Sequence, residues 1–379
     1  MGTTINGYCH EKFERVRDAF AANFANGSDL GASFAATVDG EYVVDLWGGH
    51  LDEEKQQPWK EDTIVNVYST TKTMAALCAL VLADRGEIDL YEKVAKYWPE
   101  FAQNGKADVE VRHFLSHSAG LSGMDGPLTT ADAYDWEKMT RLLAAQAPWW
   151  KPGTQSGYHA ITQGYLIGEV VRRVTGSSLG TFFRREIAEP IGADFHIGLD
   201  PRHFPRIGNL IPPPTGNAPI SGGDANSIAA RTFRYPATNA LDSRTEEWRR
   251  AEIPAGNGHG NARSVAKVQT LVANGGSAFG KRILSKAGCD RAFDEQSNGI
   301  DLVFGTPVRF GMGYGLTSPE FPLGPNPHTC FWGGWGGSLV IVDADARVCL
   351  AYVMNKMGAG TTGDARGAAL AMATFQSLG

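Results

Sequence analysis

The sequence predicts an α+β protein in which the two ends of the chain form an antiparallel sheet and a mainly helical domain is inserted between them. Strand-like runs gather near both termini, whereas the middle of the chain holds longer helical stretches and irregular connections. The length of 379 residues exceeds the roughly 150 residues that serve as a prior for one domain. Two structural units that share a cleft are therefore expected.

The N-terminal part is expected to hold one helix and one hairpin. Four apolar residues recur at helical spacing ahead of a turn at Asn26-Gly27: Phe13, Val16, Phe20 and Phe24. The patterns of residues 32–38 and 41–47 predict two strands. These strands flank Asp39-Gly40, a dipeptide that favours a tight hairpin because both central positions adopt positive φ.

The C-terminal part repeats this arrangement of two strands and a turn. Residues 338–342 and 348–354 form apolar runs on either side of the polar turn 343–347. A last helix is predicted over residues 365–378.

The middle of the chain is expected to be helical. A helical pattern over residues 165–174 is followed by Gly176, which is typical of a helix C-terminus. We therefore divide the chain into a discontinuous α/β domain, residues 1–90 plus 290–379, and a mainly helical domain, residues 91–289.

One segment of the helical part lacks a regular pattern. Residues 199–226 are rich in proline and glycine, including Pro212-Pro213-Pro214, and are not expected to form long regular structure. Two interpretations stay open at this point. The segment is either a loop over a site or an ordinary excursion on the surface.

Composition and charge narrow the classes of function. Hydrophobic residues make up 42% and charged residues 20% of the chain, as in ordinary globular proteins. The formal net charge is −6 and no basic cluster is visible. No nucleic-acid partner is therefore expected, and a small neutral or cationic substrate is favoured over a polyanion.

The cysteines and the apolar segments bear on the compartment. The five cysteines are scattered without a CxxC pair, so reduced thiols are expected rather than a zinc or redox site. No secretory signal is visible, and the longest apolar stretch, residues 74–83, is shorter than the ~20 residues that span a bilayer. We expect a cytoplasmic protein without a membrane partner.

The central chemical signal is the run Ser69-Thr70-Thr71-Lys72 at the start of an apolar segment that should form a buried helix. Residues three apart share one helix face, so the Lys72 amine can reach the Ser69 hydroxyl. The helix N-terminus offers N–H groups and partial positive charge to a developing oxyanion. Burial favours the neutral amine, which can act as a base. By itself the pattern also fits an N-capping serine beside a solvated lysine.

Two further elements give this run a context. Tyr158 lies in a loop ahead of the helix near Tyr165, where a tyrosine is usually a packing residue. Near Lys72 its phenol could instead pass a proton between serine and leaving group, because cationic neighbours lower the pKa of a phenol. Glycines in the run 332–337 would let a ligand approach the backbone, and a free N–H there could complete an oxyanion hole with that of Ser69.

Together these motifs resemble the class C β-lactamase-like serine hydrolases and, within them, the family VIII carboxylesterases. The resemblance covers nearly the whole chain. It rests on Ser69-Thr70-Thr71-Lys72, Tyr158-His159-Ala160 after Pro152-Gly153, Trp332-Gly333-Gly334, and the supporting stretches 111–121 and 257–263.

The resemblance implies a β-lactamase-like fold, with an antiparallel sheet of about nine strands flanked by helices and the site beside the inserted helical domain. It implies Ser69 as the nucleophile, with Lys72 and Tyr158 as its general-base system. The N–H groups of Ser69 and Trp335 would then form the oxyanion hole. No metal and no organic cofactor is implied.

Two departures from the β-lactamase pattern bear on the substrate. Trp332-Gly333-Gly334 stands where those enzymes carry Lys-Thr-Gly, so the cation that would hold a substrate carboxylate is missing. Ala160 stands where they carry the asparagine of Tyr-x-Asn, which removes an amide that would bind an acylamino side chain. Both changes also occur in the esterase branch and favour an uncharged ester.

Five residues are candidates for the substrate pocket: Trp332, Gly333, Gly334, His159 and His259. For the two histidines, a structural role with satisfied hydrogen bonds is favoured over a pocket role.

Two other patterns are set aside. The run 176–180 matches the G-x-S-x-G nucleophile elbow, but a helix rather than a strand precedes it, so its serines are expected to cap the next helix. His113 and His117 lie four apart, yet Phe114 replaces the glutamate of H-E-x-x-H. Structural hydrogen bonds are expected for these histidines rather than zinc.

We therefore predict a serine carboxylesterase that hydrolyses small, uncharged, short-chain acyl esters through an acyl-enzyme. The enzymatic alternatives on the same residues are a β-lactamase, a D-amino-acid peptidase and an acyl transferase, and weak β-lactam hydrolysis is compatible with the prediction. An alternative from another class is a catalytically silent binding protein. The oligomeric state is not predicted.

Overall fold

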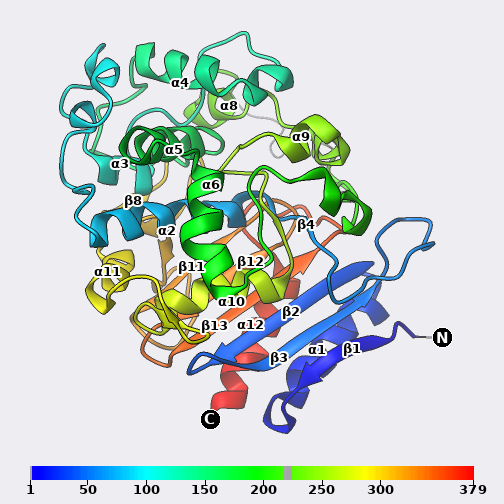
Figure 1. The fold of residues 1–379 in the computed structure, drawn as a ribbon. Coiled ribbons are helices and arrows are strands. Elements are labelled where there is room, and N and C mark those ends of the chain that lie inside the picture. The colour runs from blue at the N-terminus through cyan, green and yellow to red at the C-terminus, as the bar shows by residue number, and fades with distance from the viewer. Residues whose placement is uncertain (1, 217, 219–223) are drawn as a thin grey trace.

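The computed structural model describes residues 2–216, 218 and 224–379, and in this part of the chain nine strands form one antiparallel sheet. Its order is β1-β3-β2-β13-β12-β11-β10-β9-β8, so strands from the two ends of the chain meet at the centre (Figure 1). The described strands are β1 Ile5–Cys9, β2 Gly31–Val38, β3 Glu41–Gly49, β4 Val65–Asn66, β5 His259–Gly260, β6 Ser277–Ala278, β7 Lys281–Arg282, β8 Ser297–Ile300, β9 Pro307–Phe310, β10 Gly315–Leu316, β11 Thr329–Gly333, β12 Leu339–Asp343 and β13 Val348–Met354.

Helices cover both faces of the sheet. In Figure 1, α10 lies on one face while α1 and α12 lie on the other, and every residue of β13 is buried, as expected for a strand covered on both sides. The described helices are α1 Glu14–Ala25, α2 Thr71–Asp84, α3 Val111–Leu115, α4 Trp136–Ala145, α5 Thr162–Thr175, α6 Leu179–Phe183, α7 Glu189–Ile191, α8 Ile228–Thr232, α9 Glu246–Arg250, α10 Ala262–Ala273, α11 Lys286–Asp290 and α12 Ala365–Leu378.

The elements predicted at the two ends of the chain are confirmed. The first hairpin joins β2 and β3 through Asp39 and Gly40, whose φ angles are +52° and +88°. The predicted C-terminal pair corresponds to β12 and β13, and the last helix begins and ends at the predicted residues. The helix α5 ends at Gly176 in the left-handed conformation, because glycine has no side chain to oppose a positive φ.

The helical part of the chain packs on α2, the helix that follows Ser69. This helix contacts α5, α6 and α11, and its first thirteen residues, 71–83, are all buried. The domain division at residues 90 and 290 stays a prediction. Within the expected helical part, however, α10 packs directly on the sheet.

The described residues of the segment 199–226 do not border the pocket at Ser69. The segment contains a 3-10 helix over Pro201–Arg206 and a parallel bridge between Ile211 and Lys356. Residues 217 and 219–223 of this segment lie outside the described part of the chain.

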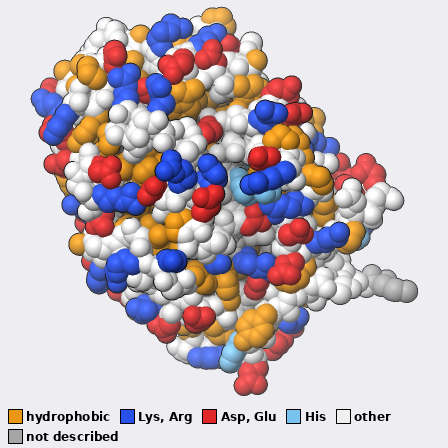
Figure 2. Space-filling model, viewed as in Figure 1, with side chains coloured by type: hydrophobic (Ala, Val, Ile, Leu, Met, Phe, Trp, Pro, Cys, Tyr) orange, Lys and Arg blue, Asp and Glu red, His pale blue; other side chains and the backbone are white. Residues whose placement is uncertain are grey.

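The surface carries both signs of charge. On the face in Figure 2, Lys and Arg side chains are interspersed with Asp and Glu rather than gathered by sign. All five cysteines are free thiols. In the described ranges, no helix combines the length and the apolar character that a membrane crossing requires.

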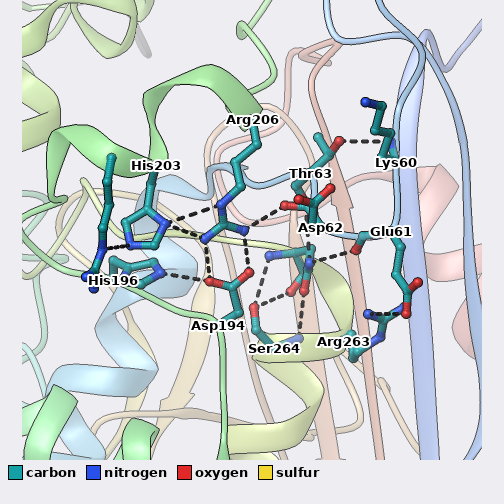
Figure 3. A network of polar contacts seen from close by, with 12 residues as sticks. Lys60, Glu61, Asp62, Thr63, Asp194, His196, His203, Arg206, Arg263 and Ser264 are labelled. Carbon is teal, nitrogen blue, oxygen red and sulfur yellow. Dashed lines mark hydrogen bonds and ion pairs between the residues drawn. The ribbon is translucent and has the colours of Figure 1, made fainter.

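A polar network holds residues 194–206 against the strand that leads to Ser69 (Figure 3). Arg206 donates to both carboxylate oxygens of Asp194, at 2.5 and 2.7 Å, and His196 Nε2 lies 2.8 Å from the same carboxylate. The backbone of Ile64, directly before β4, hydrogen-bonds to Arg206 O and Gly208 N. The network therefore contacts the chain just before β4, and the turn that holds Ser69 comes just after this strand.

Candidate active site

Ser69 lies in a 3-10 turn, Tyr68–Thr70, between β4 and the buried helix α2. Neighbouring backbone fixes this turn, because Val67 N donates to Gly258 O at 2.9 Å. The Thr70 hydroxyl is 2.9 Å from the hydroxyl of Ser338, which in turn donates to Val67 O at 2.8 Å. The nucleophile predicted from the sequence is therefore held rigidly at the start of the helix.

Lys72 reaches Ser69 from the first turn of α2. Its Nζ lies 3.0 Å from Ser69 Oγ and donates to Ala160 O at 2.6 Å and to Ala255 O at 2.8 Å. The side chain is buried, and this burial lowers the pKa of Lys72 well below its usual value. The site therefore favours a neutral amine beside the hydroxyl.

Tyr158 comes from the loop ahead of α5 (Thr162–Thr175) and meets the same hydroxyl. Its phenol oxygen is 2.5 Å from Ser69 Oγ, and Lys72 Nζ lies 4.9 Å from the centre of its ring. The structure thus brings the three predicted side chains together around one oxygen. Their catalytic roles stay predictions.

The expected effect of the site on the phenol is wrong in sign. Cationic neighbours were expected to lower the pKa of Tyr158, but burial raises it, and the hydrogen bond with Ser69 offsets only part of that rise. Burial acts on the phenol and on the Lys72 amine in opposite directions. It therefore favours the neutral form of both groups.

The two N–H groups expected to form an oxyanion hole are free to bind a ligand. Among the described residues, neither Ser69 N nor Trp335 N has a hydrogen-bond acceptor. Both residues line one cavity. Their use as an oxyanion hole stays a prediction.

Gly334 has a different role from the one expected. The sequence predicted that glycines here let a ligand approach the backbone, but a Cβ on Gly334 would lie 2.2 Å from Val67 O and 2.3 Å from Ser338 Oγ. A Cβ on Gly333 would lie 2.3 Å from the backbone of Thr362. Both glycines therefore let other parts of the chain approach, and neither lines the cavity at Ser69.

One cavity is lined by Tyr158, and another is lined by its stacking partner Phe304. The first, of about 40 Å³, contains Ser69 and is walled by aromatic and aliphatic groups of Tyr68, Ile161, Phe233, Trp248 and Trp335. The second, of about 250 Å³, is lined by Trp332 together with Phe304, Val308, Phe321 and Phe331. The predicted pocket residue Trp332 therefore belongs to the second cavity, and Thr361 borders both.

His159 and His259, the two histidines named as pocket candidates, line neither of these two cavities. His159 is buried with Nε2 accepting from Leu121 N at 3.1 Å and Nδ1 2.6 Å from Gly157 O. His259 is buried in β5, which pairs with β4. The polar partners of His159 fit a structural role, whereas both ring nitrogens of His259 are buried without a hydrogen-bond partner among the described residues.

Sequence reasoning missed two kinds of group near the Lys72 amine: backbone carbonyls and the side-chain amide of Asn66. The carbonyls of Ala160 and Ala255 hold Lys72, and backbone groups leave no signal in a sequence. Asn66 accepts from the indole of Trp248 at 2.8 Å and donates to Gly256 O at 2.8 Å. It thereby joins a wall of the small cavity to the loop that carries Ala255.

The motifs that were set aside have structural roles. Ser178 caps α6 by accepting from Thr181 N at 3.3 Å, as expected for a helix N-cap. His113 accepts from Glu110 N, and His117 accepts from His159 N. Within the described ranges no group of three or more candidate side chains is arranged to hold a metal ion.

A serine at the start of a buried helix, in contact with an amine and a phenol beside a large antiparallel sheet, defines an active-site serine protein of the β-lactamase-like fold. The family profile described as Beta-lactamase matches residues 17–373. The chain belongs to this Beta-lactamase family.

Relatives agree with this assignment over nearly the full length. The chain is 35% identical over 368 residues to "Esterase/beta-lactamase LipL" of Mycobacterium tuberculosis, covering 94% of this chain and 84% of that protein. A crystal structure of a family VIII carboxylesterase is 44% identical, with a TM-score of 0.93 and coverage of 99% and 100%. A penicillin-binding protein homologue from Caulobacter crescentus is 40% identical, with the same TM-score and coverage.

Proposed function

We propose that this chain is a carboxylesterase that hydrolyses small, uncharged esters through an acyl-enzyme on Ser69. One observation carries the proposal: a single hydroxyl lies within hydrogen-bond reach of a buried amine and a buried phenol, at 3.0 and 2.5 Å. The similarity to a family VIII carboxylesterase and to an esterase/β-lactamase supports ester hydrolysis as the reaction.

Lys72 is the base in this proposal. A neutral amine has two N–H donors and one lone pair. The carbonyls of Ala160 and Ala255 take the two donors, so the lone pair is left for the Ser69 hydroxyl. The amine accepts the hydroxyl proton as Ser69 Oγ forms a bond to the ester carbonyl carbon.

Tyr158 carries the proton onward. When Ser69 O–H donates to Lys72, the phenol O–H donates to Ser69 Oγ, at the point where the tetrahedral intermediate forms. As the C–O bond to the alcohol breaks, the phenol protonates the departing oxygen and is reprotonated from the Lys72 ammonium. Water then repeats the steps in reverse and releases the acid and free Ser69.

The N–H groups of Ser69 and Trp335 support the charge of the intermediate. Both are without acceptors among the described residues and border the cavity that holds the Ser69 hydroxyl. Two such donors would stabilise the oxyanion more than the ground-state carbonyl, which lowers the barrier.

The cavities support a short acyl group and a larger alcohol. The acyl side is the cavity of about 40 Å³ at Ser69, whose lining contains no charged side chain. The phenol that protonates the alcohol stacks on Phe304, with ring centres 4.7 Å apart, and Phe304 lines the cavity of about 250 Å³. The single cation in that lining, Arg309, is paired with Glu295.

Hydrolysis of β-lactams is the second candidate. A relative described as an esterase and β-lactamase favours it. The lack of a cation at Trp332 and of an amide at Ala160 argues for weak turnover. Nitrocefin hydrolysis that matches the rate on simple esters would place the β-lactam reaction first.

The cytoplasmic location stays a prediction.

The test is the Ser69→Ala variant with p-nitrophenyl acetate and butyrate. Removing the nucleophile is expected to lower kcat by on the order of 10⁴-fold or more, with an unchanged circular dichroism spectrum. A variant that keeps most of its activity contradicts the proposal. A fluorophosphonate probe distinguishes the proposed esterase from a catalytically silent binding protein. It should label the wild-type protein and not Ser69→Ala, and a wild type that is not labelled would favour the silent protein.

A further inference from the structure

Asp301 is a buried carboxylate that contacts the backbone of Tyr158 from the edge of the sheet. It lies directly after β8 (Ser297–Ile300) and is completely buried. One of its oxygens, Oδ1, accepts from Tyr158 N at 3.1 Å, from Val303 N at 2.9 Å and from Phe304 N at 3.0 Å. A carboxylate thus joins the loop that carries the phenol to a second loop, 143 residues further along the chain.

The second loop supplies the ring that faces the phenol. Phe304 stacks on Tyr158 with ring centres 4.7 Å apart and an angle of 21° between the rings. The same carboxylate oxygen therefore fixes both the backbone of the tyrosine and the backbone of its stacking partner. Because the backbones of Tyr158 and Phe304 are both fixed, the Tyr158 ring has little freedom to turn away from Ser69.

His117 completes the support around Tyr158. Its carbonyl accepts from Gly157 N at 2.9 Å, and its Nδ1 accepts from His159 N at 3.0 Å. Three consecutive N–H groups, of which Asp301 takes the middle one, are thus all satisfied by side chains or backbone from elsewhere in the fold. This loop lacks regular structure, yet these three backbone N–H groups all have acceptors, as they would in a strand.

A capping role alone does not explain Asp301. An aspartate that accepts from the second and third N–H groups after it is a common turn, and the contacts to Val303 and Phe304 are of that kind. The contact to Tyr158 N is not needed for such a turn. The second oxygen, Oδ2, is buried without a partner among the described residues, which is costly for a group with only a turn to cap.

We propose that Asp301 is a positioning residue for Tyr158, which holds the phenol where it can protonate the departing alcohol. The proposal rests on the proposed esterase function. It predicts a dependence on the leaving group, because p-nitrophenolate leaves without a proton whereas an alkoxide needs one. A loss of positioning should therefore harm alkyl esters and largely spare p-nitrophenyl esters.

The test compares Asp301→Ala with the wild type on ethyl butyrate and p-nitrophenyl butyrate, because an asparagine would keep an oxygen that accepts from the same N–H groups. The two substrates form the same acyl-enzyme, so the ratio of their kcat/KM values reports the acylation half-reaction, in which the alcohol departs, and leaves out deacylation. For ethyl butyrate, we expect kcat/KM to fall by on the order of 10-fold or more, with a change below about 2-fold for p-nitrophenyl butyrate. The Tyr158→Phe variant should show the same selectivity at larger size.

The double variant Asp301→Ala/Tyr158→Phe separates positioning from general damage. If Asp301 acts through the phenol, the double variant should be no slower on ethyl butyrate than Tyr158→Phe alone. Asp343→Ala is the matched control, because Asp343 is also completely buried and accepts from a backbone N–H, that of Ala346 in the turn between β12 and β13. Its ratio of activities on the two esters should equal that of the wild type.

Equal losses on both esters in a folded Asp301→Ala protein, or additive losses in the double variant, overturn the proposal. If Asp301→Ala does not fold, Asp301→Ser decides, because a serine hydroxyl can still accept from the N–H groups of its own turn but ends one bond short of the carboxylate oxygen that accepts from Tyr158 N. A selective loss on ethyl butyrate then supports the proposal and an equal loss overturns it. Failure of the wild type to hydrolyse either ester would instead overturn the proposed esterase function.

Discussion

Two polar clusters near β4, one at Asp194 and one at Lys72, differ in what holds their titratable group. In the network of Figure 3, Asp194 and Arg206 form a two-pronged ion pair. Burial alone would raise the pKa of Asp194, but the hydrogen bonds from Arg206 and His196 lower it overall. At the candidate active site, Lys72 has carbonyls and a hydroxyl as partners and no carboxylate, and burial lowers its pKa.

The two clusters differ in the presence of a counter-ion: Asp194 has one in Arg206, whereas the partners of Lys72 are a hydroxyl and two carbonyls. A partner of opposite charge keeps a half-buried group ionised, and such a group is unreactive. A buried lysine without such a partner becomes a base instead, at a cost in stability. The comparison therefore predicts effects on activity and on stability at Lys72, and mainly an effect on stability at Asp194.

The largest expected effect comes from Lys72→Met, which removes the amine but keeps the length of the side chain. Loss of the base should lower kcat/KM on p-nitrophenyl butyrate by on the order of 10²–10⁴-fold. The matched control is Lys106→Met, because Lys106 is another buried lysine whose Nζ donates to carbonyls, those of Gln103 and Gln146. Burial lowers its pKa to about 8, yet no serine hydroxyl lies beside it. Equal losses in both variants would refute a specific role for Lys72.

The next effect concerns stability against pH. The folded-state pKa of Lys72 lies below that of the unfolded chain, so between the two values the unfolded state binds one more proton. The free energy of unfolding of the wild type should therefore rise relative to that of Lys72→Met between pH 7 and 9, by up to about 1.4 kcal/mol per pH unit. Urea unfolding at three pH values measures this difference. Parallel curves would mean that the folded protein keeps the proton on Lys72.

A smaller effect is expected in the second cluster. The folded-state pKa of Asp194 is lowered, so its ion pair stabilises the fold above the unfolded pKa and is lost as the pH falls toward the folded value. The carboxylate side chain is 37% exposed, so Asp194→Asn should cost only about 1 kcal/mol at pH 7. The difference from the wild type should shrink between pH 5 and 3. Ester hydrolysis should stay within about 2-fold of the wild type, and a larger loss would couple this network to the site.

The smallest effect on activity is expected for Ser178→Ala. Ser178 donates to Glu252 at 2.6 Å and caps α6, and burial raises the pKa of that carboxyl. A serine beside a carboxyl, without an amine or phenol, has no base of the kind that Ser69 has. We expect esterase activity within about 2-fold of the wild type and a stability loss of about 1 kcal/mol. An inactive but folded variant would restore the nucleophile-elbow interpretation.

Much of the fold, and two of the three central residues, could be predicted from local pattern. The turn at Asp39-Gly40 and the last helix follow from short-range periodicity, and the structure contains both. The spacing of Ser69 and Lys72 on one helix face is also local. Tyr158 lies 89 residues from Ser69, and its place at the site came from a family resemblance rather than from spacing.

The sequence by itself determined which residues could supply the chemistry. Helix spacing, turn dipeptides and apolar runs depend on near neighbours in the chain, so they can be recognised in the sequence. Only the tertiary structure decided how those residues behave. It buried His159 and His259 away from the cavities, used Gly334 for a close backbone contact, and brought Asp301 to the Tyr158 backbone. It also reversed the expected shift of the phenol's pKa, because desolvation depends on all the groups that surround a side chain and no short stretch of sequence records them.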